Sequence, residues 1–563
     1  MYAVFYDMWC DQDYFSGDPE SLLSLDLIEK HCFFPFHVRR RSTFLDPRTE
    51  KVHSTMTSID PRKDTSNTTT THNRDDHNSV HIVFVHLDLG IGGAEQLVIQ
   101  LAKASRDLGH TVDIVTTRCD QDHCFAAVKQ PHGELSNNVK VYGRWIPSNI
   151  FGVATALMST VRMIYLTYKV ITAYERLPGG GRGKRLHRTA DVVVVDVLPT
   201  SLPLLLTWMS SAGILFYCHF PDKLLLRNNR GGIFKKLYRR FLDSIEEHTM
   251  GMSDTLVVNS NFTLGVVEEH FPVLSSQRQE QNNNHITQPI KVLHPALDTS
   301  NMVQANNRDK STRSPIVSLN RFERKKNVGL LIQAYAYIKN KTGYTLPPLV
   351  IAGGYDTQNV ENVEYRGELG TLAKELGVSV DFRLDITDAE RATLFQTALC
   401  VVYTPDKEHF GIVPLEAMFA GTPVLAVNSG GPLETVRDGE TGFLREPTPE
   451  AFGEALMVLI EDPNRATHMG KRGRTHVEST FGTRRFETQW KELVDETKAA
   501  SIKRRARENK LILLGNLPGC MLTLFAAWIF LHALTWIFRQ HGILAPYESL
   551  LGALRSRIQG DEL

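Results

Sequence analysis

The chain has 563 residues, enough for two or three domains with substantial hydrophobic cores. It carries 63 basic and 63 acidic residues, so a formal charge of +0 excludes a global field that would attract nucleic acid. The seven cysteines are scattered without the spacing of a disulfide framework, which favours a reducing compartment. Cys119, His123 and Cys124 form a loose cluster, but without a second pair of ligands we expect no metal site there.

The N-terminal segment is expected to lie outside the folded core. Residues 1–20 contain five acidic residues and no sustained apolar run, so we expect no secretory signal peptide. Residues 53–79 are rich in Ser, Thr, Asn, Asp and His, a composition that favours disorder. Residues 1–79 are therefore predicted to be a disordered or irregular N-terminal extension.

A first α/β domain is predicted over residues 80–300. Apolar, β-branched runs alternate here with helical segments, a pattern typical of a parallel sheet with helices on its faces. Two longer apolar stretches, 151–171 and 198–215, are interrupted by charged residues or by Pro203, so we expect core or interfacial helices rather than membrane spans. The expected strands are His81–Leu87, Gly109–Thr116, Asp191–Asp196 and Ile214–Tyr217, and a helix is expected over Ala94–Leu108.

The same alternation restarts near Ser314 and predicts a second α/β domain over residues 301–497. The two doubly wound halves are expected to be joined by the Gln-, Asn- and charge-rich stretch at 275–313. The expected strands are Ile316–Leu319, Leu349–Ala352, Cys400–Val402 and Val424–Val427, and helices are expected over Val328–Ile338 and Phe481–Thr497.

A long uncharged run follows the second domain. Residues Leu511 to Phe538 include no Asp, Glu, Lys or Arg. As a helix, residues 520–538 would rise about 28 Å, close to the thickness of a bilayer's hydrocarbon core. Basic residues just before the run place that side in the cytosol. Residues 498–563 are therefore predicted to be a basic linker, a membrane anchor and a short tail, with a re-entrant hairpin as the open alternative.

Glu408 and Glu416 stand eight residues apart around a predicted strand-to-helix loop. Glu408 is expected in the loop, and Glu416 in the first turn of a helix that starts at Pro414 and ends at Gly421. In an open α/β sheet, the crevice outside the carboxyl ends of the strands binds ligands. Carboxylates there can accept hydrogen bonds from the hydroxyls of a sugar. The alternative is one solvated glutamate and one placed to favour the helix dipole.

Two further segments could meet a phosphate group. Gly92 and Gly93 follow a strand and open a helix, which allows the backbone to approach a phosphate closely. Their spacing is not that of a dinucleotide-binding fingerprint. Arg321 and Lys326 also follow a strand, and a guanidinium with an ammonium can neutralise a leaving diphosphate without a metal. The alternative for this pair is a solvated basic run.

Taken together, these segments resemble those of a known family. The resemblance covers roughly residues 80–497 and is carried most closely by Cys218–Leu225, Asn320–Asn327 and Glu408–Pro414. They resemble the retaining glycosyltransferases of the GT-B fold, family 4, and within it the α-1,3/1,6-mannosyltransferases of the dolichol-linked oligosaccharide pathway. The resemblance implies two Rossmann-like doubly wound domains that face a cleft, the first for the acceptor and the second for the donor.

The resemblance also implies the substrates. The donor is expected to be GDP-mannose, and the acceptor a dolichyl-diphosphate chitobiose that carries one mannose. An α-1,3 mannose and then an α-1,6 mannose would be added during assembly of the N-glycan precursor, on the cytosolic face of the endoplasmic reticulum membrane. No cofactor or metal is implied, because no Asp-x-Asp run stands beside the donor segments. Other mannosyltransferases of the pathway are conceivable partners, and nucleic acid is not.

The roles of the family's donor-binding residues can be carried onto this chain. Gly92 and Gly93 would lie beneath the donor diphosphate, and Arg321 and Lys326 would hold it as GDP departs. The remaining donor-binding positions are Gly353 and Gly354, which would border the guanine; Gly411, Ile412 and Val413, whose amides would form a further phosphate site; and Glu416, which would bind the ribose hydroxyls.

Four residues would act at the reacting sugar: Glu408, His219, Arg321 and Lys326. Glu408 would bind the mannose hydroxyls near the anomeric carbon. His219 would face the reacting sugar and accept or relay a proton or a hydrogen bond, a packed histidine in a turn being the alternative. Whether retention proceeds by front-face attack or by double displacement stays open, because the sequence identifies no carboxylate for the second route.

Two other functions stay open at this point. One is a GT-B family 4 glycosyltransferase that uses a different nucleotide sugar. The other is a non-catalytic scaffold of a mannosyltransferase complex. A scaffold could lose its carboxylates and diphosphate-binding cations, and their presence here favours the enzyme.

Overall fold

The computed structural model describes residues 79–149, 155–174, 189–221, 243–272, 274, 289–297 and 314–508. The described residues from Val80 onward belong to one compact unit. Residues 1–78 of the predicted extension and the predicted anchor Leu511–Phe538 lie outside the described residues. Within the described ranges, no helix is both long enough and apolar enough to cross a membrane.

The first half is built on a seven-stranded sheet in the order β3-β2-β1-β4-β5-β6-β7, and every printed pairing in it is parallel. Its strands are β1 (His81–Val85), β2 (Thr111–Thr116), β3 (Val139–Val141), β4 (Val192–Asp196), β5 (Gly213–Cys218), β6 (Thr255–Val258) and β7 (Lys291–Val292). Its helices are α3 (Gly93–Asp107), α4 (Thr155–Tyr174), α5 (Leu202–Trp208), α8 (Asn261–His270) and, from the end of the described chain, α17 (Thr483–Glu508).

Helices cover both faces of this sheet, because successive strand side chains point to opposite sides. On β1, Val83 and Val85 pack with α4 and α5, whereas Ile82 and Phe84 pack with α3 and α17. The predicted core helix in residues 151–171 is confirmed as α4.

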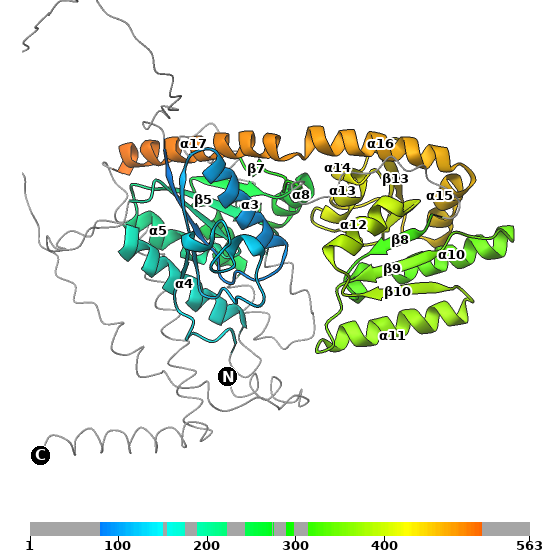
Figure 1. The fold of residues 1–563 in the computed structure, drawn as a ribbon. Helices are drawn as coiled ribbons and strands as arrows, with labels where there is room; N and C mark the ends of the chain where they lie inside the picture. Colours follow the sequence, from blue (N-terminus) through cyan, green and yellow to red (C-terminus); the bar gives the residue numbers. More distant parts are fainter. Residues whose placement is uncertain are drawn as a thin grey trace, which may run out of the picture. The chain divides into compact units, whose positions relative to one another are not determined.

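Helix α17 belongs to the first half although it follows the second half in the sequence (Figure 1). Its Trp490 is fully buried, stacks on Phe84 with ring centroids 6.2 Å apart, and donates its indole N–H to the Ser105 hydroxyl at 2.8 Å. The predicted second domain, residues 301–497, therefore ends inside a helix that packs on the first sheet.

The second half is built on a six-stranded parallel sheet in the order β10-β9-β8-β11-β12-β13. Its strands are β8 (Ile316–Leu319), β9 (Leu349–Gly353), β10 (Val380–Leu384), β11 (Cys400–Tyr403), β12 (Val424–Val427) and β13 (Gly442–Arg445). Its helices are α10 (Gly329–Thr342), α11 (Val360–Glu375), α12 (Asp388–Thr397), α13 (Ile412–Phe419), α14 (Pro432–Thr435), α15 (Pro449–Glu461) and α16 (Pro463–Thr480).

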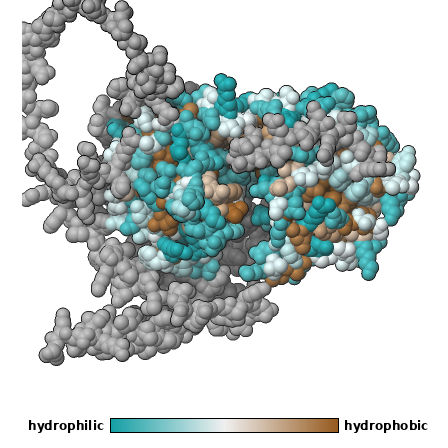
Figure 2. Space-filling model, viewed as in Figure 1, coloured by the Kyte–Doolittle hydropathy of each residue, from teal (hydrophilic) through white to brown (hydrophobic). Residues whose placement is uncertain are grey.

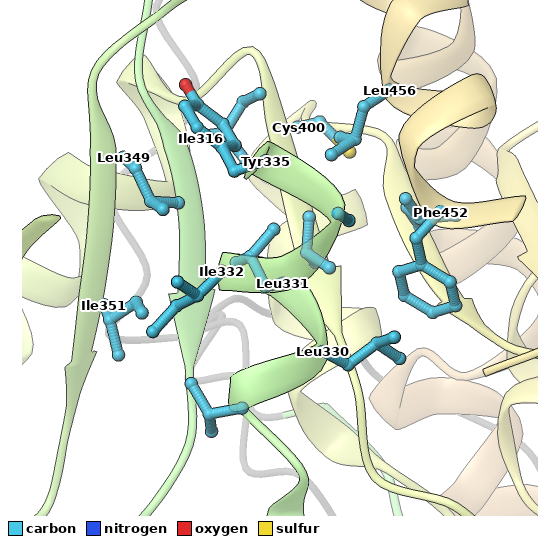
Figure 3. Close-up of a cluster of buried hydrophobic side chains, with 14 of the residues drawn as sticks. Ile316, Leu330, Leu331, Ile332, Tyr335, Leu349, Ile351, Cys400, Phe452 and Leu456 are labelled. Carbon is cyan, nitrogen blue, oxygen red and sulfur yellow. The ribbon is translucent and has the colours of Figure 1, made fainter. Parts of the chain in front are cut away.

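The core of this half also has two layers. Figure 3 shows Leu331 of α10 and Phe452 of α15 in one layer, which includes Ile316 of β8. On the other face, Leu415 of α13 packs with Val401 of β11. On the face seen in Figure 2, hydrophilic residues cover much of the described surface and hydrophobic ones gather in separate patches. The apolar residues of the strands and helices thus mainly pack between each sheet and the helices on its two faces.

Each of the eight predicted strands is confirmed, with ends shifted by at most two residues. The five strands that were not predicted include short edge strands such as β3 and β7, of three and two residues. The edge strand β10 was missed although its sequence, V-D-F-R-L, alternates apolar and charged residues, the pattern of a half-buried strand; the prediction relied on continuous apolar runs.

Candidate active site

Lys326 and Glu408 form an ion pair at the carboxyl ends of two neighbouring strands. Lys326 lies in the 3-10 turn Arg324–Lys326 after β8, and Glu408 lies in the loop after β11, which pairs with β8. The Lys326 ammonium donates to Oε2 of Glu408 at 2.6 Å, and the two side chains are 12% and 25% exposed. Burial alone would raise the pKa of Glu408, but the adjacent ammonium outweighs it and lowers that pKa. The structure thus brings together two predicted site residues.

The backbone of the Glu408 loop rests against the loop that follows β12. The Glu408 carbonyl accepts a hydrogen bond from the Gly431 amide at 2.7 Å. A Cβ atom on Gly431 would lie 2.1 Å from the Phe410 carbonyl oxygen, and one on Gly430 would lie 2.5 Å from the Glu408 carbonyl oxygen. Neither glycine was predicted as a site residue, although a Gly-Gly-Pro run directly after a predicted strand was a usable signal.

Tyr403, the last residue of β11, lies beneath the same loop. Burial raises the pKa of Tyr403 well above its usual range, and the nearby Glu408 carboxylate raises it further. Gly411 has a φ of +80° and lies over the tyrosine ring, so that a Cβ there would be 3.2 Å from the ring edge. Only glycine adopts this backbone readily in so close a packing.

The helix after Gly411 starts earlier than predicted. Helix α13 begins at Ile412 rather than at Pro414, with Gly411 as its N-cap. The amides of Gly411, Ile412 and Val413 therefore lie at a helix N-terminus, as expected. Glu416 falls in the second turn, so its predicted place in the first turn is wrong. The positive φ of Gly411 turns the chain sharply, which lets the helix start before the proline.

Glu416 is paired with a different cationic residue from the one that pairs with Glu408. Its side chain is 8% exposed, and Oε1 lies 3.5 Å from Nη1 of Arg391 on α12. Burial raises the pKa of Glu416, and Arg391 opposes that rise. Arg391 was not predicted, because only the packing of α12 against α13 brings it to this carboxylate.

Arg321 and the two predicted guanine-site glycines lie together. A Cβ on Gly353, at the end of β9, would lie 1.8 Å from the Asn320 carbonyl oxygen, so the two loops touch only because this residue lacks a side chain. A Cβ on Gly354 would lie 3.7 Å from Cγ of Arg321. The Arg321 side chain is 64% exposed, with Nη1 3.1 Å from Glu323, so this guanidinium reaches solvent.

In the first half, the predicted glycine-rich loop holds an anion of its own. Gly92 is the N-cap of the 15-residue helix α3, and Gly93 is its first residue, with no atom within 4 Å of a Cβ built there. The carboxylate of Glu95, in the first turn, folds back so that Oε2 would lie 2.3 Å from a Cβ on Gly92. The helix N-terminus thus already stabilises negative charge at this loop.

His219 does not pack as an isolated histidine. Its Nε2 lies 3.0 Å from Oδ2 of Asp196, and the same carboxylate lies 2.8 Å from Nδ1 of His86. His86 follows β1 directly and Asp196 ends the adjacent strand β4, so both lie at the carboxyl edge of the first sheet. Neither residue was predicted, although a polar residue at the end of each of two buried apolar runs was a signal for this edge.

The two halves meet one residue away from His219 and Glu408. Phe220 and His409 stack with ring centroids 3.7 Å apart and an interplanar angle of 9°. The Ser260 hydroxyl donates to the His409 carbonyl at 2.6 Å. Candidate residues from both halves are therefore connected by a direct ring contact.

A second contact between the halves lies at the start of α8. The carboxylate of Glu434, on α14, accepts hydrogen bonds from the amides of Asn261 and Phe262 at 2.9 and 2.7 Å. It also lies 2.9 Å from Nε2 of His294. A side chain of the second half thus caps a helix of the first.

Within the described ranges, no group of three or more His, Cys, Asp or Glu side chains could hold a metal ion. The loose cluster of Cys119, His123 and Cys124 is among the residues covered by that finding.

Two family models match the chain. The model described as Glycosyl transferases group 1 matches residues 302–476, and the model described as Glycosyltransferase Family 4 matches residues 91–278. The alpha-1,3/1,6-mannosyltransferase alg2 of Schizosaccharomyces pombe is 37% identical over 446 residues, which cover 73% of this chain and 80% of that protein. The alpha-1,3/1,6-mannosyltransferase ALG2 of Homo sapiens is 38% identical over 422 residues, which cover 72% of this chain and 94% of that protein.

Among solved structures, sucrose-phosphate synthase from Thermosynechococcus elongatus is similar to this chain with a TM-score of 0.57. The identity is 21%, and the likeness covers 75% of this chain and 100% of that chain. At this identity the likeness concerns the fold alone. It shows the GT-B arrangement of two parallel sheets with helices that the sequence resemblance implied.

Proposed function

Because this chain belongs to the α-1,3/1,6-mannosyltransferase family, we propose that its donor is GDP-mannose and its acceptor a dolichyl-diphosphate-linked oligosaccharide. The chain is a glycosyltransferase that makes α-1,3 and α-1,6 mannosyl linkages. In the proposed reaction, a lipid-linked chitobiose with one mannose receives the α-1,3 mannose first and the α-1,6 mannose second.

The ion pair between Lys326 and Glu408 is the observation that carries this proposal. When the bond between the sugar and GDP breaks, negative charge builds up on the diphosphate. A partly buried ammonium stabilises that charge more strongly than water would, because it is already positioned and poorly screened. The Glu408 carboxylate, kept ionised by Lys326, can accept hydrogen bonds from the mannose hydroxyls.

Arg321 and the glycine loops complete the donor site in this proposal. Arg321 is exposed beside Gly353 and Gly354, and its buried partner Glu323 also pairs with Lys325, so Arg321 can turn toward a diphosphate while Glu323 keeps a cation. Gly92 and Gly93 at the start of α3, and Gly411 at the start of α13, would supply backbone amides to phosphate oxygens.

We propose a front-face reaction for the retention of configuration. The bond between the anomeric carbon and the diphosphate oxygen breaks, and the acceptor oxygen bonds to that carbon on the same face. The acceptor hydroxyl passes its proton to the departing diphosphate oxygen, and GDP leaves. Lys326 stabilises the diphosphate throughout, so this route needs no protein nucleophile.

We place the reaction at the cytosolic face of the endoplasmic reticulum membrane. The uncharged run Leu511–Phe538 and the basic residues before it support an anchor with this orientation. A lipid-linked acceptor would then be held at the same surface as the catalytic domains. Other mannosyltransferases of the pathway would meet the enzyme there.

The test uses the full-length protein in detergent, supplied with the singly mannosylated lipid acceptor and one nucleotide sugar at a time. We expect GDP-mannose to give a trimannosyl product and GDP-glucose or UDP-sugars to give little or none. Glu408→Ala should abolish the product with the fold retained, and Glu440→Ala, at an exposed glutamate paired with Arg437, should leave it unchanged. Equal use of another nucleotide sugar, or no product from the parent protein, would refute the proposed substrates.

A further inference from the structure

One buried carboxylate serves two histidines at the carboxyl edge of the first sheet. Asp196 has a side chain only 3% exposed. Its oxygens lie 2.9 and 2.8 Å from Nδ1 of His86, and Oδ2 also lies 3.0 Å from Nε2 of His219. An ionised carboxylate can only accept hydrogen bonds, so each of these ring nitrogens must carry a proton.

His86 is the counterion that keeps Asp196 ionised. Its other ring nitrogen, Nε2, lies 2.9 Å from the carbonyl oxygen of Asp88, which is also only an acceptor. Both ring nitrogens of His86 therefore donate, and the ring is an imidazolium. In agreement, burial lowers the pKa of His86 but the Asp196 charge outweighs it and raises that pKa to about 10. The buried pair is thus a cation and an anion that neutralise each other.

His219 is the member of this group that reaches outward. Its side chain is 20% exposed, whereas those of His86 and Asp196 are each 3% exposed. With Nε2–H committed to Asp196, neutral His219 has its unshared electron pair on Nδ1. The Tyr217 ring, with its centroid 5.1 Å from that of His219, packs against the imidazole and limits its rotation.

The backbone after Asp196 is strained. Val197 has a φ of +66°, which is rare for a β-branched residue. The Leu198 amide donates to the Asp196 carbonyl at 2.7 Å and closes a three-residue turn around Val197. Strain of this kind persists where the surrounding structure imposes it, and it clusters at functional sites. Here it occurs immediately beside the shared carboxylate.

We propose that Asp196 is a positioning residue: it holds Nε2–H of His219, so that Nδ1 accepts a hydrogen bond from a hydroxyl of the reacting sugars. His86 supports this role by neutralising Asp196 in a buried position. The inference rests on the proposed mannosyl transfer, because it names the group that His219 contacts. Asp196 touches no substrate in this account and acts only through His219.

The first experiment is independent of activity. An imidazole N–H bonded to a carboxylate gives a downfield, slowly exchanging proton signal, so we expect such signals from His86 and His219 in the full-length protein. His219→Gln should remove one signal, and Asp196→Ala should remove both. The His81 signal from its bond to Asp113, at 3.2 Å, should survive both changes. If His219→Gln removed no downfield signal, the bond to Asp196 would be absent and the proposal overturned.

The second experiment is a double-mutant cycle on mannosyl transfer. Asp196→Ala should lower kcat about 10²-fold, the scale of one lost hydrogen bond positioned at the reacting groups, and KM for GDP-mannose should stay within about 3-fold. In a His219→Gln background, Asp196→Ala should lower kcat less than about 3-fold, because the imidazole through which Asp196 acts is already absent. Equal losses in both backgrounds would show a merely structural role and overturn the proposal.

Two further variants serve as controls for the double-mutant cycle. Asp196→Ala leaves the His86 cation unpaired, so the cycle is repeated with Asp196→Asn, whose amide oxygen can still accept from His219. That variant should retain more activity than Asp196→Ala. Asp113→Asn is the matched control, because Asp113 is another carboxylate paired with a histidine of β1, namely His81, the first residue of that strand. It should leave kcat per folded molecule unchanged.

The two proposals fail in different ways. If the parent protein transferred no mannose from GDP-mannose, the substrate assignment would fail, and the proton signals would still test the contact between Asp196 and His219. The slow hydrolysis of GDP-mannose that occurs without acceptor shows whether the hydroxyl that donates to Nδ1 of His219 belongs to the donor or to the acceptor. A loss of hydrolysis in Asp196→Ala places the hydroxyl on the donor, and unchanged hydrolysis places it on the acceptor. Either result is compatible with the positioning role.

Discussion

The rings of Phe220 and His409 stack 3.7 Å apart, and each follows a candidate catalytic residue directly in the sequence. Phe220 follows His219 in the first half, and His409 follows Glu408 in the second. The stack therefore joins the two halves one residue away from both His219 and Glu408. Burial lowers the pKa of His409 to about 4, so its ring is neutral and packs as an aromatic group at physiological pH.

Replacing His409 tests the importance of this stack. His409→Phe keeps an aromatic ring and should retain most of the parent kcat. His409→Ala removes a ring contact of about 1 kcal/mol, and we expect kcat to fall about 3- to 10-fold because the contact that joins the halves beside Glu408 and His219 is lost. Steady-state mannosyl transfer measures both variants. Equal activity of the alanine and phenylalanine variants would contradict the role of the stack.

The low pKa of His409 also predicts a pH dependence of stability. Above pH about 6.5 the residue is neutral in both the folded and unfolded chains, so its full contribution to folding is present. As the pH falls from about 6.5 toward about 4, the unfolded chain gains a proton that the folded chain refuses, and stability falls. Denaturant unfolding at several pH values should show a smaller fall in His409→Phe than in the parent. Parallel curves would contradict the shifted pKa.

Lys326 and Lys325 are adjacent lysines in different surroundings. Lys326 is 12% exposed and paired with Glu408, whereas Lys325 is 67% exposed and paired with Glu323. We expect Lys326→Ala to lower kcat about 10²- to 10³-fold, because it removes a positioned charge at the leaving group. Lys325→Ala is the control and should change kcat less than about 2-fold, because the lysine itself is mostly exposed and its partner Glu323 keeps Arg321 as a cation. Similar losses of kcat in both variants would mean that the overall positive charge of this segment, and not the ion pair with Glu408, supports the reaction.

Gly431 allows the loop after β12 to lie against the Glu408 loop. In Gly431→Ala the new Cβ would lie 2.1 Å from the Phe410 carbonyl oxygen, so the backbone around Glu408 must shift. We expect a loss of about 1–3 kcal/mol in the free energy of unfolding and a lower kcat. Gly367→Ala, in α11 with no atom near its Cβ, should instead gain about 0.5–1 kcal/mol. Denaturant unfolding and the transfer assay compare the two, and an active, stable Gly431→Ala would contradict the close packing.

Much of the fold could be predicted because buried parallel strands need apolar residues on both faces. The runs Val192–Asp196 and Cys400–Tyr403 are fully buried and were recognised from composition alone. The edge strand Val380–Leu384 is not a continuous apolar run, and its alternation of apolar and charged residues was a usable signal that was overlooked. The start of α13 was misplaced because Gly411 adopts a positive φ that no local pattern announces.

The site was predictable where motif residues follow strands, and not where packing brings distant residues together. Lys326 and Glu408 each follow a strand, and the adjacency of β8 and β11 makes them an ion pair. The partner of Glu416, in contrast, is Arg391, which comes from a neighbouring helix and follows no motif. His86 and Asp196 are 110 residues apart, and only the pairing of β1 with β4 makes them a buried pair.

The most direct test of the account is single-turnover transfer by Glu408→Gln. With saturating GDP-mannose and acceptor, the variant should form product about 10²- to 10³-fold more slowly than the parent. The affinity of the variant for GDP should change little. The glutamine side chain has the same shape as the glutamate that accepts a hydrogen bond from Lys326, and it lacks only the negative charge. Product formation at the parent rate would contradict a catalytic carboxylate at this position.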